Sequence, residues 1–303
     1  MAVGPPGRLT AGPVKSKPAL GQLGIWSAEL RHGDPGEVAD AAGELEELGF
    51  GALWIPGEAS SDLLGHVDHL LGATRLATIA TGILNIWMEC SEVVSAWWRA
   101  LPAEHAERFL LGLGVSHGAI IGQDYSRPLT AMRDYLDRLS ADGVPANRMC
   151  LAALGPKMLE LARDRTAGAH PYLTTPEHTQ EARAILGPSP LLAPMQFVIL
   201  ESNAERARDL ARPYVKGYGQ LANYANSWRR LGFTEDDIAG CSDHLVDALF
   251  AWGDEGQIAR RVNAHIAAGA DHVCLQVVAP ARNSIAAALP IWRALAPALL
   301  AGR

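Results

Sequence analysis

The sequence predicts a (β/α)8 barrel. Eight apolar, strand-like segments alternate with amphipathic helical segments from residue 23 onward. After the last of these strands comes one helical segment with apolar residues at helical spacing, as closure of a barrel requires: Ile285, Leu289, Trp292, Leu295 and Leu299. The chain has 303 residues, which is enough for this fold, typically ~250 residues long. An open, doubly wound sheet is the alternative that the same alternation allows.

Composition indicates a soluble globular protein with a large core. Hydrophobic residues make up 49% of the chain, and the formal net charge of −7 speaks against broad nucleic-acid or anionic-membrane surfaces. No run reaches the ~18 apolar residues of a membrane span. We therefore expect a small-molecule substrate. We also expect a cytoplasmic protein with reduced core thiols, because no two cysteines form a C-x-x-C pair: Cys90, Cys150, Cys241 and Cys274.

Local signals place the elements. Residues 1–19 contain Gly, Pro and Lys but no apolar segment, which predicts a flexible tail before a single domain at 20–303. Asp34 precedes Pro35 and Glu37, the pattern of a helix cap, a first helical residue and a capping-box acid. Asp62 and Asn203 are further caps. The predicted strands cover residues 23–28, 52–55, 79–87, 109–115, 151–154, 169–173, 195–200 and 272–278.

The long interval between the seventh and eighth strands contains helical patterns of its own. They include residues 223–231, a cap at 234–237, and residues 243–250. We interpret residues 204–256, approximately, as a functional helical insertion, because a linker of this length would not have its own apolar periodicity.

In a barrel, chemistry belongs at the carboxyl ends of the strands. At one such end, residues 154–158, a buried strand is followed by a glycine and then by a helix that begins with a proline. Backbone N–H groups in the first helical turn lack partners within the helix, so Gly155, Lys157 and Met158 form a candidate phosphate site or an ordinary strand–helix turn. The other strand-end residues are Ser27, Glu58, Asn85, His117, Tyr172 and Gln276.

Three segments, residues 81–85, 112–117 and 153–157, together resemble the bacterial-luciferase-like family of flavin and deazaflavin oxidoreductases. The match is closest to the branch that uses coenzyme F420, and residues 269–272 before the last strand extend it. The resemblance implies a luciferase-like (β/α)8 barrel with a non-proline cis peptide, here Gly82–Ile83; a β-bulge at Gly82 is the plainer alternative. The implied cofactor-binding residues are Gly82, Ile83, Asn85, Gly114, Ser116, Leu154, Gly155, Lys157, Met158 and His170.

The candidate acid–base residues are His117 and Glu58. In sugar-phosphate dehydrogenases of the deazaflavin branch, a histidine after the second strand and a glutamate after the fourth do this work. This sequence has Glu58 at the first place and His117 at the second, which argues against a sugar-phosphate substrate. Both residues titrate, so either can handle a proton, or His117 can serve only as a cofactor contact and Glu58 as a solvated loop residue.

The leading functional hypothesis is hydride transfer between coenzyme F420 and a small organic substrate. The alternatives are an FMN-dependent luciferase-like monooxygenase, a degenerate non-catalytic barrel, and an aldolase or isomerase barrel that binds phosphate. His66 and His69 have no evident third ligand, so we expect no metal site. We also expect a homodimer, on the basis of the family resemblance and of the helix that carries Trp97 and Trp98. The tryptophans predicted to line an aromatic pocket are Trp26, Trp54 and Trp87.

Overall fold

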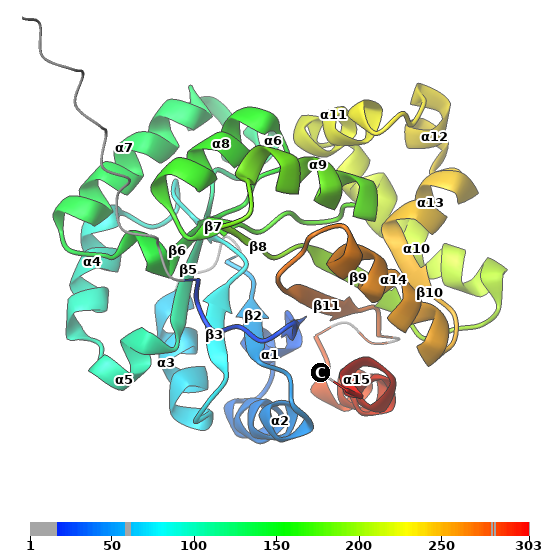
Figure 1. Cartoon of the computed structure of the whole chain (residues 1–303), viewed down its shortest axis with the longest axis horizontal. Coiled ribbons are helices and arrows are strands. Elements are labelled where there is room, and N and C mark those ends of the chain that lie inside the picture. The colour runs from blue at the N-terminus through cyan, green and yellow to red at the C-terminus, as the bar shows by residue number, and fades with distance from the viewer. Residues whose placement is uncertain (1–16, 58–61, 280, 282, 303) are drawn as a thin grey trace, which may run out of the picture.

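A computed structural model describes residues 17–57, 62–279, 281 and 283–302 of the chain (Figure 1). Its parallel strands form one sheet in the order β10-β9-β11-β1-β2-β3-β5-β6-β7-β8, with β4 paired to β5. The strands are β1 (Leu23–Trp26), β2 (Ala52–Ile55), β3 (Thr78–Thr81), β4 (Leu84–Asn85), β5 (Phe109–Gly114), β6 (Met149–Leu151), β7 (Gly168–Ala169), β8 (Leu191–Leu192), β9 (Met195–Ile199), β10 (Phe250–Trp252) and β11 (Val273–Val277).

The sheet closes into a ring through the segment of the chain that contains β8 and β9. Strand β8 pairs with β7, whereas β9 pairs with β11, and only Ala193 and Pro194 separate β8 from β9 in the chain. Strand β11 in turn pairs with β1, with Leu23 opposite Val273. The ring of parallel strands confirms the predicted barrel and is incompatible with an open sheet.

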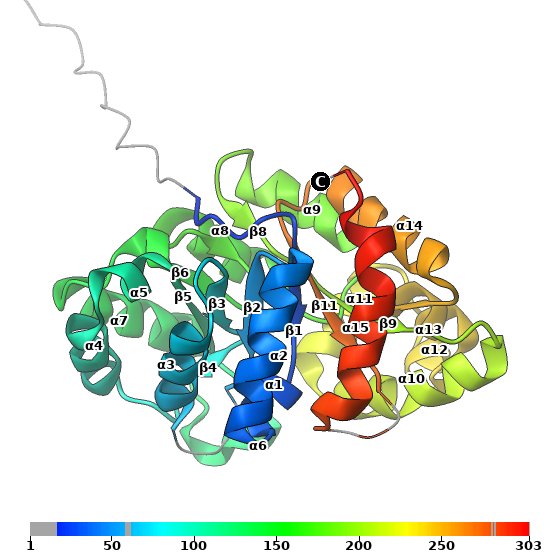
Figure 2. The ribbon, with the colours of Figure 1, turned by 90° about the horizontal axis from the view of Figure 1, so that it is seen from below.

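Helices surround this ring (Figures 1 and 2). The helix after the first strand, α2, packs against the last helix, α15, where the two ends of the barrel meet. The α-helices are α1 (Glu29–His32), α2 (Pro35–Leu48), α3 (Leu63–Ala73), α4 (Ser91–Ala100), α5 (Ala103–Glu107), α6 (Gly118–Ile121), α7 (Pro128–Ala141), α8 (Pro156–Arg165), α9 (Pro176–Leu186), α10 (Ala204–Gly219), α11 (Ala222–Arg230), α12 (Glu235–Gly240), α13 (Asp243–Leu249), α14 (Glu255–Ala267) and α15 (Ile285–Leu300).

The helix caps follow the local signals. Asp34, Asp62 and Asn203 each accept a backbone N–H with the side chain at the predicted helix starts. Thr234 forms a capping box with Asp237. At α2 only half of the predicted capping box is present: Asp34 accepts the N–H groups of Gly36 and Glu37, but among the described residues the Glu37 side chain accepts no bond from the Asp34 N–H.

Two predicted elements are wrong in detail. The third strand, predicted as continuous over 79–87, is interrupted at Gly82–Ile83, where the peptide bond is cis as the resemblance implied. Phe250, predicted as the end of a helix, instead begins β10, which pairs with β9 through Phe250 and Phe197. The interval between β9 and α14 therefore holds four helices and one strand, gathered on one side of the barrel (Figure 1).

The barrel interior has an aromatic and histidine core. Trp54 is 0% exposed, stacks on His170 with ring centroids 4.3 Å apart, and donates its Nε1–H to His272 Nε2 at 3.1 Å. The prediction that Trp54 lines a substrate pocket is therefore wrong. Cys150, Cys241 and Cys274 are buried free thiols, but Cys90 is exposed and is no core thiol.

The predicted tail and one predicted site residue fall largely outside the described part. Residues 1–16 and Glu58 are not among the residues that the structure describes. Lys17 forms an ion pair with the domain, because its Nζ lies 2.5 Å from Asp271 Oδ1. Within the described residues, no helix combines the length and apolarity needed to cross a membrane.

Candidate active site

A cavity of about 670 Å³ opens at the carboxyl ends of the strands. The ten predicted cofactor residues and His117 all line it. Pro56 and Gly57 also line it, immediately before Glu58, whose own position is not described. The strand-end rule thus brings together residues that lie as far apart in the chain as Gly82 and His170.

Two glycines form part of the floor of the cavity at the strand ends. A Cβ on Gly82 would lie 2.3 Å from Trp26 Nε1, and one on Gly114 would lie 2.5 Å from Ile83 Cδ1. At such distances a neighbouring side chain would have to move. In the present arrangement of the site, these two positions therefore fit glycine alone. Trp26 donates its Nε1–H to the Gly82 carbonyl at 3.1 Å, which holds the strand break from one side.

His170 presents an unpaired acceptor beneath this floor. Its Nδ1–H donates to the Ala193 carbonyl at 2.7 Å, which leaves Nε2 as the unprotonated nitrogen. Burial lowers the pKa of His170 to about 4, so the ring is neutral at neutral pH. Nε2 is buried and has no hydrogen-bond partner in the described part of the chain. An unpaired buried acceptor fits a ligand that offers an N–H or O–H group here.

The turn into α8 forms one end of the cavity. Gly155 has no atom within 4 Å of the place where a Cβ would sit. The Lys157 N–H has no partner among the described residues, but Met158 N–H donates to the Gly155 carbonyl at 3.1 Å. Met158 was predicted to offer a free N–H, and this is wrong, because the first turn of α8 is tightened by a bond three residues back.

A second cation, which the sequence did not reveal, joins this end. Arg230 of α11 donates to the Leu154 carbonyl at 2.9 Å, and His178 Nε2 donates to the same oxygen at 3.0 Å. Both bonds fix the turn that precedes α8. Lys157 and Arg230 are the charged residues among the described residues that line the cavity, so this end alone favours an anion.

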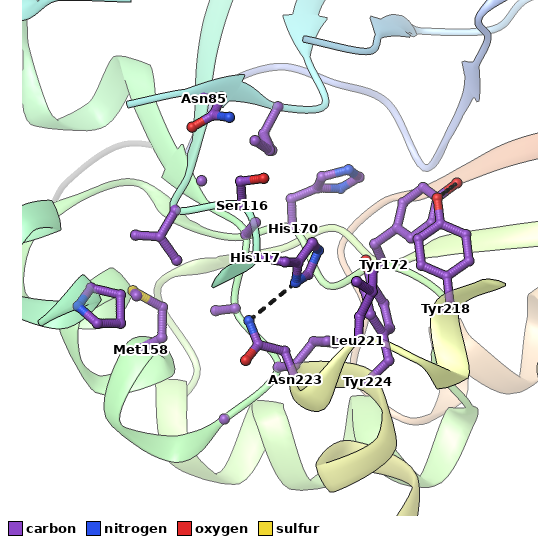
Figure 3. A pocket seen from close by; sticks show the side chains of 18 of the residues that line it. Asn85, Ser116, His117, Met158, His170, Tyr172, Tyr218, Leu221, Asn223 and Tyr224 are labelled. Carbon is purple, nitrogen blue, oxygen red and sulfur yellow. Dashed lines mark hydrogen bonds between the residues drawn. The ribbon is translucent and has the colours of Figure 1, made fainter. Parts of the chain in front are cut away.

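His117 lies on another part of the wall. The Asn223 amide donates to His117 Nδ1 at 3.4 Å, which places the imidazole proton on Nε2 (Figure 3). Burial lowers the pKa of His117 below its ordinary value, so the ring is neutral at pH 7. Ser116 has a left-handed φ of 54°, which turns the chain at the end of β5. His117 can thus donate from Nε2 and can accept a proton at Nδ1 if Asn223 moves away.

An aromatic wall lines the cavity and is formed by Trp26, Tyr172, Tyr218 and Tyr224. Its three tyrosines lie on the side away from Met158 (Figure 3). Trp26 and Tyr172 meet edge to face at 5.4 Å, and Tyr218 and Tyr224 at 4.7 Å. Tyr218 donates its O–H to Tyr172, which in turn donates to Gln276 Oε1 at 2.7 Å. These bonds join α10 to the ends of β7 and β11.

Sequence reasoning missed the contribution of α10 and α11. The cavity residues from this segment have no strand-end position, so the rule that found the others could not find them: Tyr218, Leu221, Asn223, Tyr224, Asn226 and Arg230. Of the three predicted pocket tryptophans, Trp26 lines the cavity, whereas Trp87 donates its Nε1–H to the Val115 carbonyl at 2.8 Å outside it. No cluster of three or more potential metal ligands occurs among the described residues.

The fold is shared with enzymes of two cofactor types. An F420-dependent secondary alcohol dehydrogenase, solved with an F420–acetone adduct, is similar with a TM-score of 0.69 and 14% identity over 92% of this chain and 99% of that one. The F420-dependent tetrahydromethanopterin reductase of Methanopyrus kandleri has a TM-score of 0.64 and 14% identity over the same shares. At these identities the likeness concerns the fold.

A third similar structure holds a different cofactor. The oxygenating constituent of 3,6-diketocamphane monooxygenase from Pseudomonas putida, in complex with FMN, has a TM-score of 0.65 and 13% identity over 92% of this chain and 98% of that one. No curated protein matches the chain in sequence. The profile of the luciferase-like monooxygenase family, however, matches residues 17–272. The chain therefore belongs to the luciferase-like monooxygenase family.

Proposed function

We propose that this protein is an oxidoreductase that uses coenzyme F420 to transfer a hydride to or from a small organic substrate. The observation that carries the proposal is the layout of the cavity. A floor that includes Gly82 and Gly114 belongs to the same cavity as an end where Lys157 and Arg230 lie. A long cofactor with a planar ring at one end and a phosphate at the other would fit this layout. The F420-dependent enzymes of similar fold support the choice.

The residues present fit such a cofactor. Gly82 and Gly114 would lie against the ring, because neither has a side chain to hold it off. His170 Nε2, the unpaired buried acceptor, would receive a hydrogen bond from the cofactor. The Lys157 N–H and the two cations would hold the phosphate. When bound, F420 supplies a two-electron hydride donor or acceptor, and the chain supplies position and electrostatics.

His117 is the residue that we assign to proton handling. A hydride leaving an alcohol or arriving at a carbonyl requires a proton to leave or reach the oxygen, so a neutral imidazole nearby is suited to the task. Its lowered pKa keeps this imidazole neutral over the physiological range. Glu58 stays a second candidate that the described residues do not test.

Titration with each cofactor tests the proposal. Purified protein stripped of ligand should quench or shift the fluorescence of F420 at micromolar protein, and FMN should bind at least tenfold more weakly. Binding of FMN with no binding of F420 would replace the proposal by the monooxygenase alternative. Absence of binding to both would favour the non-catalytic barrel.

A further inference from the structure

The aromatic wall contains one hydroxyl that the fold does not use. Tyr224 lines the cavity with 7% of its surface exposed, and its hydroxyl has no hydrogen-bond partner in the described part of the chain. The Tyr172 hydroxyl, by contrast, donates a hydrogen bond to the side chain of Gln276. The hydroxyl is not among the unpaired polar atoms that are fully buried, so it can be reached from the cavity, and a ligand there is its natural partner.

Tyr224 is firmly held beside His117. Its ring centroid lies 5.4 Å from that of His117, 4.7 Å from that of Tyr218, and 6.2 Å from that of Trp228 (Figure 3). Burial raises the pKa of Tyr224 well above its ordinary value, so the phenol keeps its proton. The neutral imidazole of His117 carries its proton on Nε2. Two uncharged donors therefore neighbour each other on this wall.

Charge limits what this wall can accept. The described residues that line the cavity include no carboxylate, and their two cations, Lys157 and Arg230, both belong to the α8 end. A charged group placed among Trp26, Tyr172 and Tyr218 would lose its hydration without gaining an ion partner. Edge-to-face rings, on the other hand, favour a flat apolar body.

We propose that Tyr224 binds the oxygen of a neutral, aromatic ketone or alcohol, with its hydroxyl donating to that oxygen next to His117. The inference rests on the proposed function, because it names the substrate class of the same cavity. It makes Tyr224 a substrate-binding residue and assigns substrate selection to α11, while the strand ends hold the cofactor.

Binding of three small probes tests this without turnover. The probes are acetophenone, ethylbenzene, which lacks the oxygen, and 4-acetylbenzoate, which adds a carboxylate. Calorimetry would measure each with the cofactor-free and the F420-loaded protein. With F420 bound, so that the cationic α8 end is occupied, we expect acetophenone to bind at least tenfold more tightly than 4-acetylbenzoate. Tyr224→Phe, which removes one hydrogen bond, should weaken acetophenone about tenfold and leave ethylbenzene unchanged.

Tyr214→Phe is the matched control. Tyr214 belongs to the same cluster but packs on Phe197 and Phe250 and does not line the cavity, so this variant should bind all three probes as the parent does. Equal effects of Tyr224→Phe on acetophenone and ethylbenzene, or no effect on either, would overturn the role of the hydroxyl. Absence of acetophenone binding, or equal binding of 4-acetylbenzoate to the F420-loaded protein, would overturn the substrate class.

The two proposals fail separately. If F420 does not bind but the oxygen-dependent effect of Tyr224→Phe persists in the cofactor-free protein, only the cofactor assignment falls. If F420 binds normally and Tyr224→Phe does not discriminate between the probes, the inference about Tyr224 falls and the cofactor assignment stands.

Discussion

Gly155→Val should abolish tight cofactor binding while leaving the fold nearly intact. Gly155 has φ −104° and ψ 156°, an extended conformation that suits a β-branched residue, and no atom lies within 4 Å of the added Cβ. The new side chain therefore meets open space rather than other parts of the protein. The cost to stability is that of a poorer helix N-cap, about 1 kcal/mol or less.

The expected loss of affinity is much larger. A branched side chain at this place would keep a phosphate from the Lys157 N–H and from the guanidinium of Arg230. Hydrogen bonds to charged groups contribute about 1.5–3 kcal/mol each, so losing two costs about 3–6 kcal/mol, or at least about a hundredfold in the dissociation constant. F420 fluorescence titration measures the affinity, and circular dichroism with thermal melting measures the fold.

Gly72→Val is a suitable control, because Gly72 is an exposed helical glycine with open space around it and does not line the cavity. Its cofactor affinity should equal that of the parent. If Gly155→Val also binds F420 as the parent does, the phosphate lies elsewhere and the assignment of the α8 turn is wrong.

Three further outcomes follow from the same geometry. Lys157→Ala should weaken F420 binding by no more than about tenfold in the same titration, because a charge in a solvated first turn contributes about 1 kcal/mol; a hundredfold loss would show that the side chain dominates. His117→Ala should lower turnover by about 10²–10⁴-fold with little change in F420 affinity, and an unchanged rate would remove His117 from proton handling. The folded pKa of His170, about 4, lies below its unfolded value of about 6.5, so the unfolded chain takes up the proton first as the pH falls. Stability should therefore be lost between pH 6.5 and 4, by up to about 3 kcal/mol from this residue, and urea midpoints of His170→Gln should fall less over that range; an equal fall in both proteins would contradict this.

The features that the sequence predicted are those with local or repeating causes. Asp34, Asp62 and Asn203 cap helices because the bond spans only two or three residues, so neighbours in sequence suffice. The ten residues predicted to bind the cofactor line one cavity because every strand of a barrel delivers its carboxyl end to one face. The regular alternation of strands and helices in the sequence is therefore enough to predict which distant residues lie at the same face of the barrel.

The failures have non-local causes. Trp54 and Trp26 look alike in sequence and lie opposite each other in the register of β2 and β1, in one interior cluster. Trp54 is nevertheless buried on His170, whereas Trp26 lines the cavity. The difference comes from contacts with residues distant in sequence, because Trp54 meets His170 and His272 inside the barrel and Trp26 meets Tyr172 at the cavity. Residues 250–252 form a strand only because β9 offers an edge there.

The segment α10–α13 is predicted to be functional, and its residues at the cavity support this prediction. Helix α11 reaches both parts of the cavity, because Arg230 donates to the Leu154 carbonyl at the anion end and Asn223 donates to His117 on the wall. Trp228, fully buried on the same helix, anchors it to the core. One helix thus orients the turn assigned to the cofactor phosphate and the imidazole assigned to the proton. Since both bonds come from α11, a change in its position would alter cofactor and substrate binding together, whereas a change in a side chain such as Tyr224 would alter substrate binding alone.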